Sequence, residues 1–283
     1  MPRLIAPAMN DAMYENEATR ANLASLRDRG YEIVDPERGF LAERESGIGR
    51  LASEERLLAA IERVLTRRRS LAGKRVAITA GPTREPFDPV RYFSNASTGA
   101  TGIALAREAT LRGAEVTLVL GPTLLEPPAG VRTLLRVTTA CELYDAALQH
   151  VVGADLTIAT AAVADWRPER RSDAKLKKTD EELNVRMVRN PDVLGALGER
   201  KGATFLVGFA AETEDHERNA RAKLARKHLD AIAVNDVSGE RGFGTGENQL
   251  TLLWGTQGRR ELGRADKATL AARLLDALEE LMG

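Results

Sequence analysis

The chain has 283 residues, of which 43% are hydrophobic and 29% are charged, as in an ordinary globular protein with room for one large domain or two small ones. Its 41 basic and 41 acidic side chains give a formal net charge of zero, which offers no electrostatic support for binding to nucleic acid or to a membrane surface. A single cysteine, Cys141, excludes an intrachain disulfide and an all-cysteine metal site, and the three scattered histidines lack the spacing of a zinc site.

Nothing in the sequence predicts a targeting or membrane segment. There is no run of about 18 apolar residues of the kind that spans a bilayer. The first ten residues, MPRLIAPAMN, lack the basic region and apolar core of a signal peptide. We therefore expect a cytoplasmic protein with neither a nucleic-acid nor a membrane partner.

The first 70 residues predict a short unit of alternating strands and helices. Strands are expected at residues 3–6 and 31–36, and helices at residues 16–29 and 53–68. The arginine run at the end of the second helix and the glycine that follows it mark a boundary near residues 66–74. A unit of this length is too small for a robust α/β domain, so we expect the back end of a domain whose front is missing.

From residue 71 onward, short apolar runs alternate with amphipathic helices. Strands are expected at residues 74–81, 114–121, 154–162, 203–212, 230–236 and near 248–254, and helices at residues 99–113, 138–151, 190–202, 214–228 and 266–282. This alternation, with strongly apolar strands, predicts a mostly parallel sheet covered by helices on both faces. Ligands bind such sheets at the carboxyl ends of the strands.

The segment RYFSNASTGATG, Arg91 to Gly102, contains a glycine pattern with two interpretations. A nicotinamide-dependent oxidoreductase places such glycines directly after its first strand, whereas here they come well after it, and no tyrosine is followed by a lysine at the fourth position. The second interpretation is a loop in which Ser97, Thr98 and Gly99 open a helix and offer hydroxyl and N–H groups to a phosphate. Simple helix capping by Ser97 or Thr98 is the structural alternative.

Residues 78–102, ITAGPTREPFDPVRYFSNASTGATG, resemble the start of phosphopantothenate–cysteine ligases, the ligase half of bacterial bifunctional coenzyme A biosynthesis proteins. The resemblance continues in order through ATAAVADWRPE, AKLKKTDEE, VRNPDVLGALG, VGFAAETED and AVNDV, and it spans nearly all of residues 74–283. Ala100 departs from the family pattern, which usually has a lysine there. The resemblance implies a Rossmann-like three-layer α/β fold with a mostly parallel sheet for residues 71–283.

The first 70 residues are similar to the second half of phosphopantothenoylcysteine decarboxylases. Residues 7–16, PAMNDAMYEN, resemble a substrate-binding motif of that family, and residues 41–50, LAERESGIGR, align with its flap. Glu43 stands at the position of the catalytic cysteine, and Arg44 follows where the family has glycine. We expect residues 1–70 to be a partial, inactive decarboxylase-like segment, with no flavin on this chain.

The ligase resemblance implies that 4′-phosphopantothenate and L-cysteine are joined through an acyl-cytidylate intermediate, with CTP and Mg²⁺, by a homodimer. The residue pattern alone leaves ATP open as the nucleotide. A nicotinamide-dependent oxidoreductase and a non-catalytic nucleotide-binding remnant remain as alternative functions.

The resemblance also assigns roles to individual residues. Lys175 and Asn95 are expected to act in the formation and use of the acyl-cytidylate, and Arg91 to hold the phosphate or carboxylate of phosphopantothenate with its planar fork. Asn235 is expected to face the substrate. Nucleotide binding is expected of Gly81, Ser97, Thr98, Gly99, Ala162, Asp165, Lys175, Phe209, Lys223 and Lys227, with Asp165 also as a ligand of Mg²⁺. Structural roles remain open for Lys175 in a solvated lysine loop and for Phe209 in the core.

Overall fold

The computed structural model describes residues 3–40, 46–66, 69–177, 182–212, 215–236 and 247–283. Two compact units are distinguished, Met1–Ser70 with Thr110–Gly113, and Leu71–Ala109 with Ala114–Gly283. Glu43, Arg44 and Lys178 lie outside the described residues. None of the helices in the described ranges combines the length and the apolar character needed to cross a membrane.

The first unit is small and contains two sheets of two strands each. Its elements in chain order are β1 (Leu4–Ile5), α1 (Asp11–Glu15), α2 (Glu17–Asp28), β2 (Glu32–Ile33), β3 (Glu37–Phe40), β4 (Ser46–Arg50) and α3 (Glu54–Thr66). Strands β1 and β2 pair in parallel, and β3 and β4 pair antiparallel. Val34, Ala52 and Ala60 form a small core with Leu4 and Leu57. The expected strand at residues 31–36 is therefore only two residues long, and α1 and the β3–β4 hairpin were not predicted.

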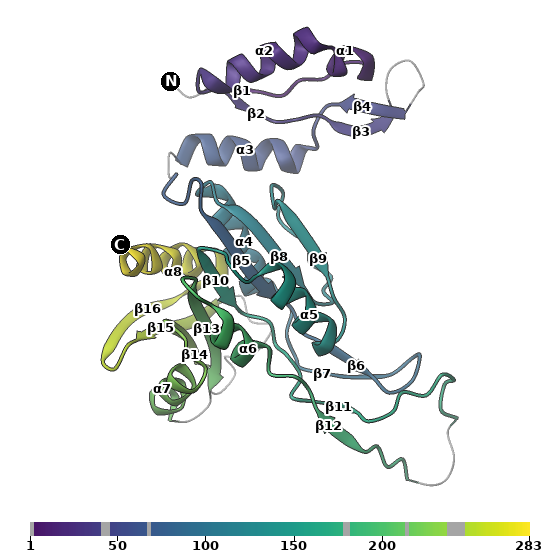
Figure 1. Cartoon of the computed structure of the whole chain (residues 1–283), viewed down its shortest axis with the longest axis vertical. Coiled ribbons are helices and arrows are strands. Elements are labelled where there is room, and N and C mark those ends of the chain that lie inside the picture. Colours follow the sequence, from purple (N-terminus) through teal and green to yellow (C-terminus); the bar gives the residue numbers. More distant parts are fainter. Residues whose placement is uncertain (1–2, 41–45, 67–68, 178–181, 213–214, 237–246) are drawn as a thin grey trace. The chain divides into compact units, whose positions relative to one another are not determined.

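The second unit is built on an eight-stranded sheet with the order β16-β15-β14-β13-β10-β5-β8-β9 (Figure 1). The strands are β5 (Arg75–Ala80), β8 (Glu115–Leu120), β9 (Thr133–Arg136), β10 (Leu156–Ala159), β13 (Phe205–Glu212), β14 (Ala231–Asp236), β15 (Glu247–Trp254) and β16 (Gly258–Asp266). The six strands from β14 to β9 run parallel, whereas β15 and β16 are antiparallel additions at one edge. The predicted mostly parallel α/β fold is confirmed, but β9 and β16 were not predicted.

Helices cover both faces of this sheet. They are α4 (Ala100–Leu111), α5 (Ala140–His150), α6 (Val193–Arg200), α7 (His216–Arg226) and α8 (Lys267–Met282). Helices α4 and α8 share one core with one face of the sheet, and α5, α6 and α7 share a second core with the other face. In β5, Val76 and Ile78 enter the first core and Ala77 enters the second, as the alternation of side chains along a strand requires. Because both faces are buried, apolar side chains follow one another without alternation from Val76 to Ile78.

Polar residues at the helix starts fix several boundaries. Thr139 and Glu142 form a capping box at α5, with the Thr139 hydroxyl accepting from the Glu142 N–H. Asp192 caps α6 by accepting from the Gly195 N–H, so the helix expected at residues 190–202 begins only at Val193. The helix expected at residues 214–228 is likewise shorter, at His216–Arg226.

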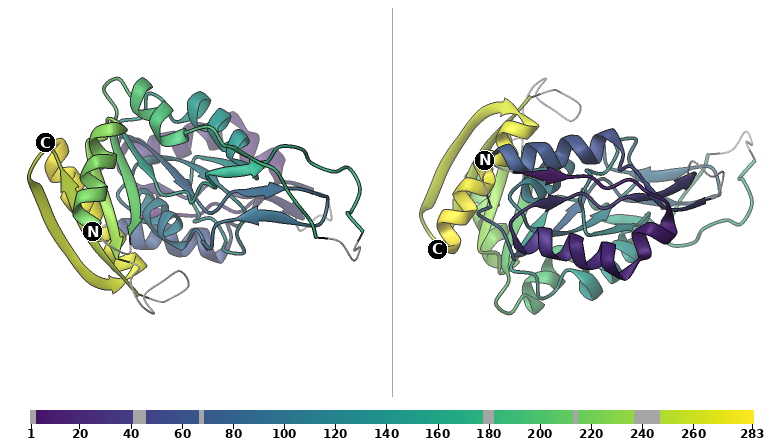
Figure 2. Two further views of the ribbon diagram at one scale, coloured as in Figure 1. Left: turned by 90° about the horizontal axis from the view of Figure 1, so that it is seen from below. Right: turned by 90° about the horizontal axis from the view of Figure 1, so that it is seen from above.

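Two short hairpins form an arm that projects from the sheet (Figures 1 and 2). The first pairs β6 (Arg84–Pro86) with β7 (Tyr92–Ser94), and the second pairs β11 (Trp166–Pro168) with β12 (Met187–Arg189). The arm is defined here as residues 84–94, 166–177 and 182–189. Its strands have three residues each, which is too short for an apolar alternation to appear in the sequence.

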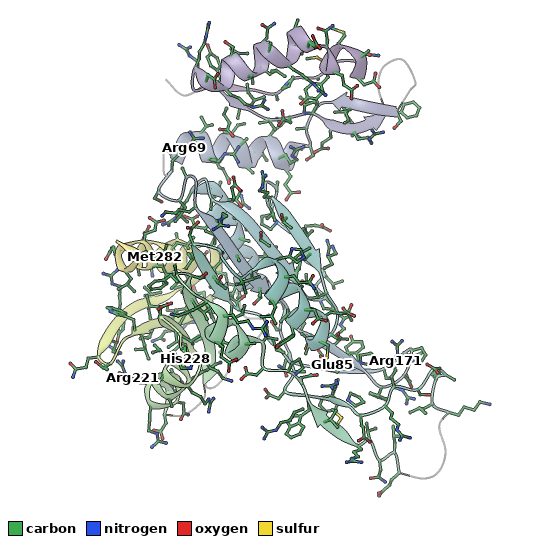
Figure 3. All side chains as sticks on the ribbon, viewed as in Figure 1. Arg69, Glu85, Arg171, Arg221, His228 and Met282 are labelled. Atoms are coloured by element: carbon green, nitrogen blue, oxygen red, sulfur yellow. The ribbon has the colours of Figure 1, made fainter. Side chains whose placement is uncertain are left out.

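The arm is fastened to the sheet layer by a buried carboxylate. Glu85, only 1% exposed, lies where the arm leaves the sheet, and Arg171 lies farther out (Figure 3). The Glu85 Oε1 accepts a hydrogen bond of 2.9 Å from the Ala140 N–H, one of the N–H groups that the first turn of α5 leaves free. The start of α5 also favours a negative charge. Glu85 therefore joins the base of the arm to the helix start.

A glycine sets the distance between α4 and the sheet. Gly102 is buried, and a Cβ added to it would lie 2.4 Å from the Ala80 Cβ and 2.5 Å from the Thr160 Oγ1. Neither neighbour can retreat, since Ala80 lies in β5 and the Thr160 hydroxyl donates to the Thr79 carbonyl at 2.7 Å. The last glycine of the TGATG pattern thus serves close packing of the helix on the strand.

We expect Gly102→Ala to lower the free energy of unfolding by roughly 1–3 kcal/mol, the usual effect of overpacking. Alanine gains about 1 kcal/mol in helix propensity, but contacts this short outweigh that gain. Chemical denaturation measures the change, with Thr101→Ala on the same helix as control. A Gly102→Ala protein as stable as the parent would contradict the close approach.

Candidate active site

A pocket lies at the carboxyl ends of the central parallel strands. It has a volume of about 750 Å³. Thr79 of β5, Ala159 of β10 and Phe209 of β13 contribute to its lining, together with Ala161, residues 163–166, residues 189–194 and the residues Lys223, Arg226 and Lys227 at the end of α7. This is the sheet edge at which the sequence predicts ligand binding.

Four of the predicted site residues, Asp165, Phe209, Lys223 and Lys227, line this pocket. The Lys223 Nζ donates to the Phe209 carbonyl at 2.8 Å, and the Lys227 ammonium pairs with the Asp192 carboxylate. Burial lowers the pKa of Lys227, and the nearby Asp165 carboxylate partly offsets that effect. The pocket therefore combines two ammonium groups with an aromatic wall, a set that suits an anionic ligand with a planar ring.

The pocket also contains residues that the sequence interpretation missed. Trp166 and Arg189 line it from the arm strands β11 and β12, with the Arg189 guanidinium 5.3 Å from the centre of the Trp166 ring. Asn190 and Arg226 line it as well, and the Asn190 Nδ2 donates to the Ala164 carbonyl at 2.8 Å. The sequence segment NPD before a helix was a usable signal for Asn190 and Asp192, since an aspartate after Asn-Pro is a typical cap.

The glycine loop lies beside the end of β5. Gly99 has a φ of 78°, and a Cβ there would lie 3.1 Å from the Gly81 Cα, so two of the predicted residues are in close backbone contact. The Ser97 Oγ accepts from the Gly99 N–H at 3.3 Å, and the Thr98 Oγ1 accepts from the Ala100 N–H at 3.4 Å. Both hydroxyls thus cap the start of α4, where free N–H groups also suit a phosphate.

Asn95 connects this loop to the pocket wall. Its Nδ2 donates to the Val163 carbonyl at 3.0 Å and to the Ala162 carbonyl at 3.4 Å. Ala162 pairs with Pro82 in an isolated bridge, and its neighbours Ala161 and Val163 line the pocket. The predicted residues Asn95 and Ala162 therefore lie together at the rim of the pocket.

Besides the glycine-loop residues, Asn95 and Ala162, three further predicted residues, Lys175, Arg91 and Asn235, do not line the pocket. Lys175 and Arg91 lie on the arm, where the Arg91 guanidinium pairs with Asp88 at 2.5 Å and donates to the Leu176 carbonyl at 2.9 Å. Asn235 lies near the end of β14, and its Oδ1 is buried without a hydrogen-bond partner in the described part of the chain. The guanidinium of Arg91 is thus already engaged by a carboxylate.

The described residues contain no group of three or more His, Cys, Asp or Glu side chains that could hold a metal ion alone. Two carboxylates, Asp165 and Asp192, do line the pocket. This set fits an ion such as Mg²⁺, which usually binds through one or two carboxylates together with phosphates of the substrate and water.

Two known families match two different parts of the chain. The family described as the DNA/pantothenate metabolism flavoprotein C-terminal domain matches residues 71–282. The family described as Flavoprotein matches residues 1–66.

Individual relatives match the whole chain. It is 41% identical over 280 residues to the coenzyme A biosynthesis bifunctional protein CoaBC of Haemophilus influenzae, covering 99% of this chain and 70% of that protein. CoaBC of Vibrio vulnificus strain CMCP6 is 44% identical over 286 residues, covering 100% of this chain and 71% of that protein. A crystal structure of the C-terminal domain of a CoaBC protein is 38% identical with a TM-score of 0.65, covering 76% of this chain and 98% of that domain. The chain therefore belongs to the family of coenzyme A biosynthesis bifunctional proteins, with a DNA/pantothenate metabolism flavoprotein C-terminal domain at residues 71–282.

Proposed function

We propose that the chain joins 4′-phosphopantothenate to L-cysteine in coenzyme A biosynthesis, with CTP as the activating nucleotide. The observation that carries this proposal is the pocket at the sheet edge, where Lys223, Lys227 and Phe209 meet in the domain that matches the C-terminal half of CoaBC proteins. Phe209 supplies an apolar wall for the base, and the two lysines offset the charge of the triphosphate.

The reaction begins with a poor electrophile, a carboxylate at neutral pH. A carboxylate oxygen of phosphopantothenate attacks the α-phosphorus of CTP, the bond to the β-phosphate breaks, and pyrophosphate leaves. The amine of cysteine then attacks the acyl carbon of the acyl-cytidylate, CMP leaves, and the amine loses a proton to solvent. Since a carboxylate and a triphosphate repel each other, cations placed beforehand around the α-phosphorus lower the barrier.

The residues of the chain fill distinct parts of this scheme. Asn95 lies at the pocket rim within 3.0 Å of the Val163 carbonyl, a position suited to holding the acyl-cytidylate. Lys175 is exposed on the arm and is proposed to approach the nucleotide during activation. Asp165 is proposed to hold Mg²⁺, which supplies further positive charge to the phosphates when bound.

A nicotinamide oxidoreductase is disfavoured by the arm segment that lies between β5 and α4. In this chain Gly102 places α4 close to the first strand, but the intervening arm segment separates that strand from the helix start. The direct strand-to-helix turn that seats a dinucleotide is thus interrupted. Fluorescence titration with NADPH tests this alternative, because the proposed ligase binds CTP instead.

For residues 1–70 we propose no decarboxylase activity. The motivation is Glu43, which stands where the resemblance places a catalytic cysteine. Glutamate has no thiol, so the group that the resemblance makes catalytic is absent from this position. Release of carbon dioxide from phosphopantothenoylcysteine by the purified chain would contradict this proposal.

We also propose a homodimer formed through the arm. Three neighbouring side chains of the first hairpin, Val90, Tyr92 and Phe93, are large, apolar and exposed, and Trp166 and Leu183 are exposed on the second hairpin. An arm without a core of its own gains most from a second copy that covers these side chains. The exposed arm also carries Lys175, so a dimer brings this lysine near a neighbouring subunit.

Lys175→Gln should slow formation of the acyl-cytidylate by about 100- to 1000-fold, since one preorganised charge contact is lost in the transition state. Pyrophosphate release with CTP, phosphopantothenate and Mg²⁺ measures this step. Lys74→Gln, an exposed lysine outside the site, is the matched control. If Lys175→Gln turns over within about threefold of the parent, Lys175 belongs to a solvated loop.

Asn95→Asp should block the second half-reaction instead. The change removes the donor to the Val163 carbonyl and places a carboxylate beside the intermediate. We expect acyl-cytidylate to accumulate without product, as measured by mass spectrometry of quenched mixtures with and without cysteine. Product formation at the parental rate would rule out this role for Asn95.

Phe93→Ser should shift the protein towards the monomer, because it removes an aromatic side chain that is 58% exposed on the arm. Analytical ultracentrifugation over a range of concentrations measures the shift. Val152→Ser, at an apolar residue 40% exposed beyond α5, is the control. Equal oligomeric states for the parent and Phe93→Ser would argue against the arm as the interface.

A further inference from the structure

A buried carboxylate joins the two halves of the arm. The Asp88 side chain is 0% exposed. Its Oδ1 accepts from the Val90 N–H at 2.8 Å and from the Arg91 N–H at 2.7 Å, which closes the turn of the first hairpin. Its Oδ2 accepts from the Arg91 Nε at 2.9 Å and from the Leu176 N–H at 3.2 Å. One carboxylate thus binds both its own hairpin and a segment far away in sequence.

Further hydrogen bonds run between the same two segments. The Arg91 Nη2 donates to the Leu176 carbonyl at 2.9 Å, and the Ser172 N–H donates to the Phe87 carbonyl at 2.9 Å. Both backbone groups of Leu176 are therefore held by the Asp88–Arg91 pair. Residues 172–177 have no regular secondary structure, so these contacts restrict a segment that no sheet or helix holds.

The carboxylate is charged under working conditions. Burial alone would raise the pKa of Asp88, but hydrogen bonds from the Arg91 side chain and from the N–H groups of Val90, Arg91 and Leu176 hold it well below the usual range. The guanidinium donates to Oδ2 from both Nε and Nη2, so the charge attraction is accompanied by two directional hydrogen bonds. The pair is consequently a fixed anchor rather than a pair that opens with small changes of pH.

Leu176 lies between Lys175 and Lys177, whose side chains are exposed. We propose that Asp88 is a positioning residue that holds this lysine-bearing segment in place for nucleotide activation, with Arg91 as the cation of the clamp. The clamp is defined as Asp88, Arg91 and the backbone of Leu176. This inference rests on the proposed ligase function and extends it, since it gives Lys175 a defined backbone position and gives Arg91 a partner within the chain.

The variant Asp88→Asn should break the clamp and leave the turn of the first hairpin intact. An asparagine whose Oδ1 keeps the bonds from Val90 and Arg91 places an amide Nδ2 where the Oδ2 accepts from the Arg91 guanidinium and the Leu176 N–H. Donors then face donors, so the link to residues 172–177 is lost while the hairpin turn remains. Arg91→Lys is a milder second variant, because it keeps the charge but loses the fork.

The first readout does not require activity. Hydrogen exchange should be faster in the peptides covering residues 172–177 of Asp88→Asn, and trypsin should cleave more rapidly after Lys175 or Lys177. Arg91→Lys should show a smaller change in the same peptides. Glu169→Gln is the matched control, because it removes a carboxylate from the same arm, where Glu169 pairs with Arg186 at 3.2 Å. Unchanged exchange and cleavage in Asp88→Asn would overturn the clamp.

The second readout links the clamp to Lys175. Asp88→Asn should slow acyl-cytidylate formation by about 10- to 100-fold, as expected when a catalytic group is displaced by about 1 Å. The KM for cysteine should not rise, because cysteine reacts only after the step that is slowed. The double variant Asp88→Asn with Lys175→Gln should be no slower than Lys175→Gln alone, since a misplaced lysine and a missing lysine affect the same step.

The outcomes separate the clamp from the proposed function. The positioning role would be overturned if the rate losses of the two single variants multiplied in the double variant. It would also be overturned if Asp88→Asn turned over within about threefold of the parent. A parent protein that releases no pyrophosphate with any nucleotide would overturn the proposed function and the role of the lysines. In that case the hydrogen-exchange and trypsin-cleavage measurements alone would test whether the clamp holds residues 172–177.

Discussion

The close approach of α4 to β5 at Gly102 is the constraint on which the site depends. Because the helix packs directly on the strand, its N-terminus and the backbone of Gly99 come to the carboxyl end of β5, next to Gly81. The parallel order of the sheet brings the ends of β10 and β13 to the same edge. The pocket, the glycine loop and Asn95 are therefore neighbours as a result of backbone packing.

The sequence predicted well the parts of the chain that follow a repeating apolar pattern. The central strands and the five helices of the second unit were found because burial on two faces leaves long apolar runs and capped amphipathic helices. The pocket residues Phe209 and Lys227 were found through the family resemblance. Edge strands such as β9 and β16 were missed, since exposure on one side breaks the apolar pattern.

The arm was missed for a different physical reason. Its three-residue strands bury little, and its structure depends on polar contacts between distant segments, such as Glu85 with the Ala140 N–H and Asp88 with the Leu176 N–H. Sequence periodicity carries no information on such pairs, because each partner is a single residue in an irregular segment. The pairing of Arg91 with Asp88 was missed for the same reason, and the expected contact of Arg91 with phosphopantothenate stays a prediction.

The ion pair between Lys227 and Asp192 affects how the pocket can accept an anion. A buried ammonium without a counter-ion would be costly to maintain, and Asp192 offsets part of that cost before any ligand arrives. An entering phosphate must therefore compete with a carboxylate that is already tethered to the start of α6. On that view, binding exchanges one anion for another. A monoanion then gains little binding free energy, whereas a polyanion that also reaches Lys223 gains more. If the pocket binds a nucleotide as proposed, the resident carboxylate favours ligands with several negative charges over simple monoanions.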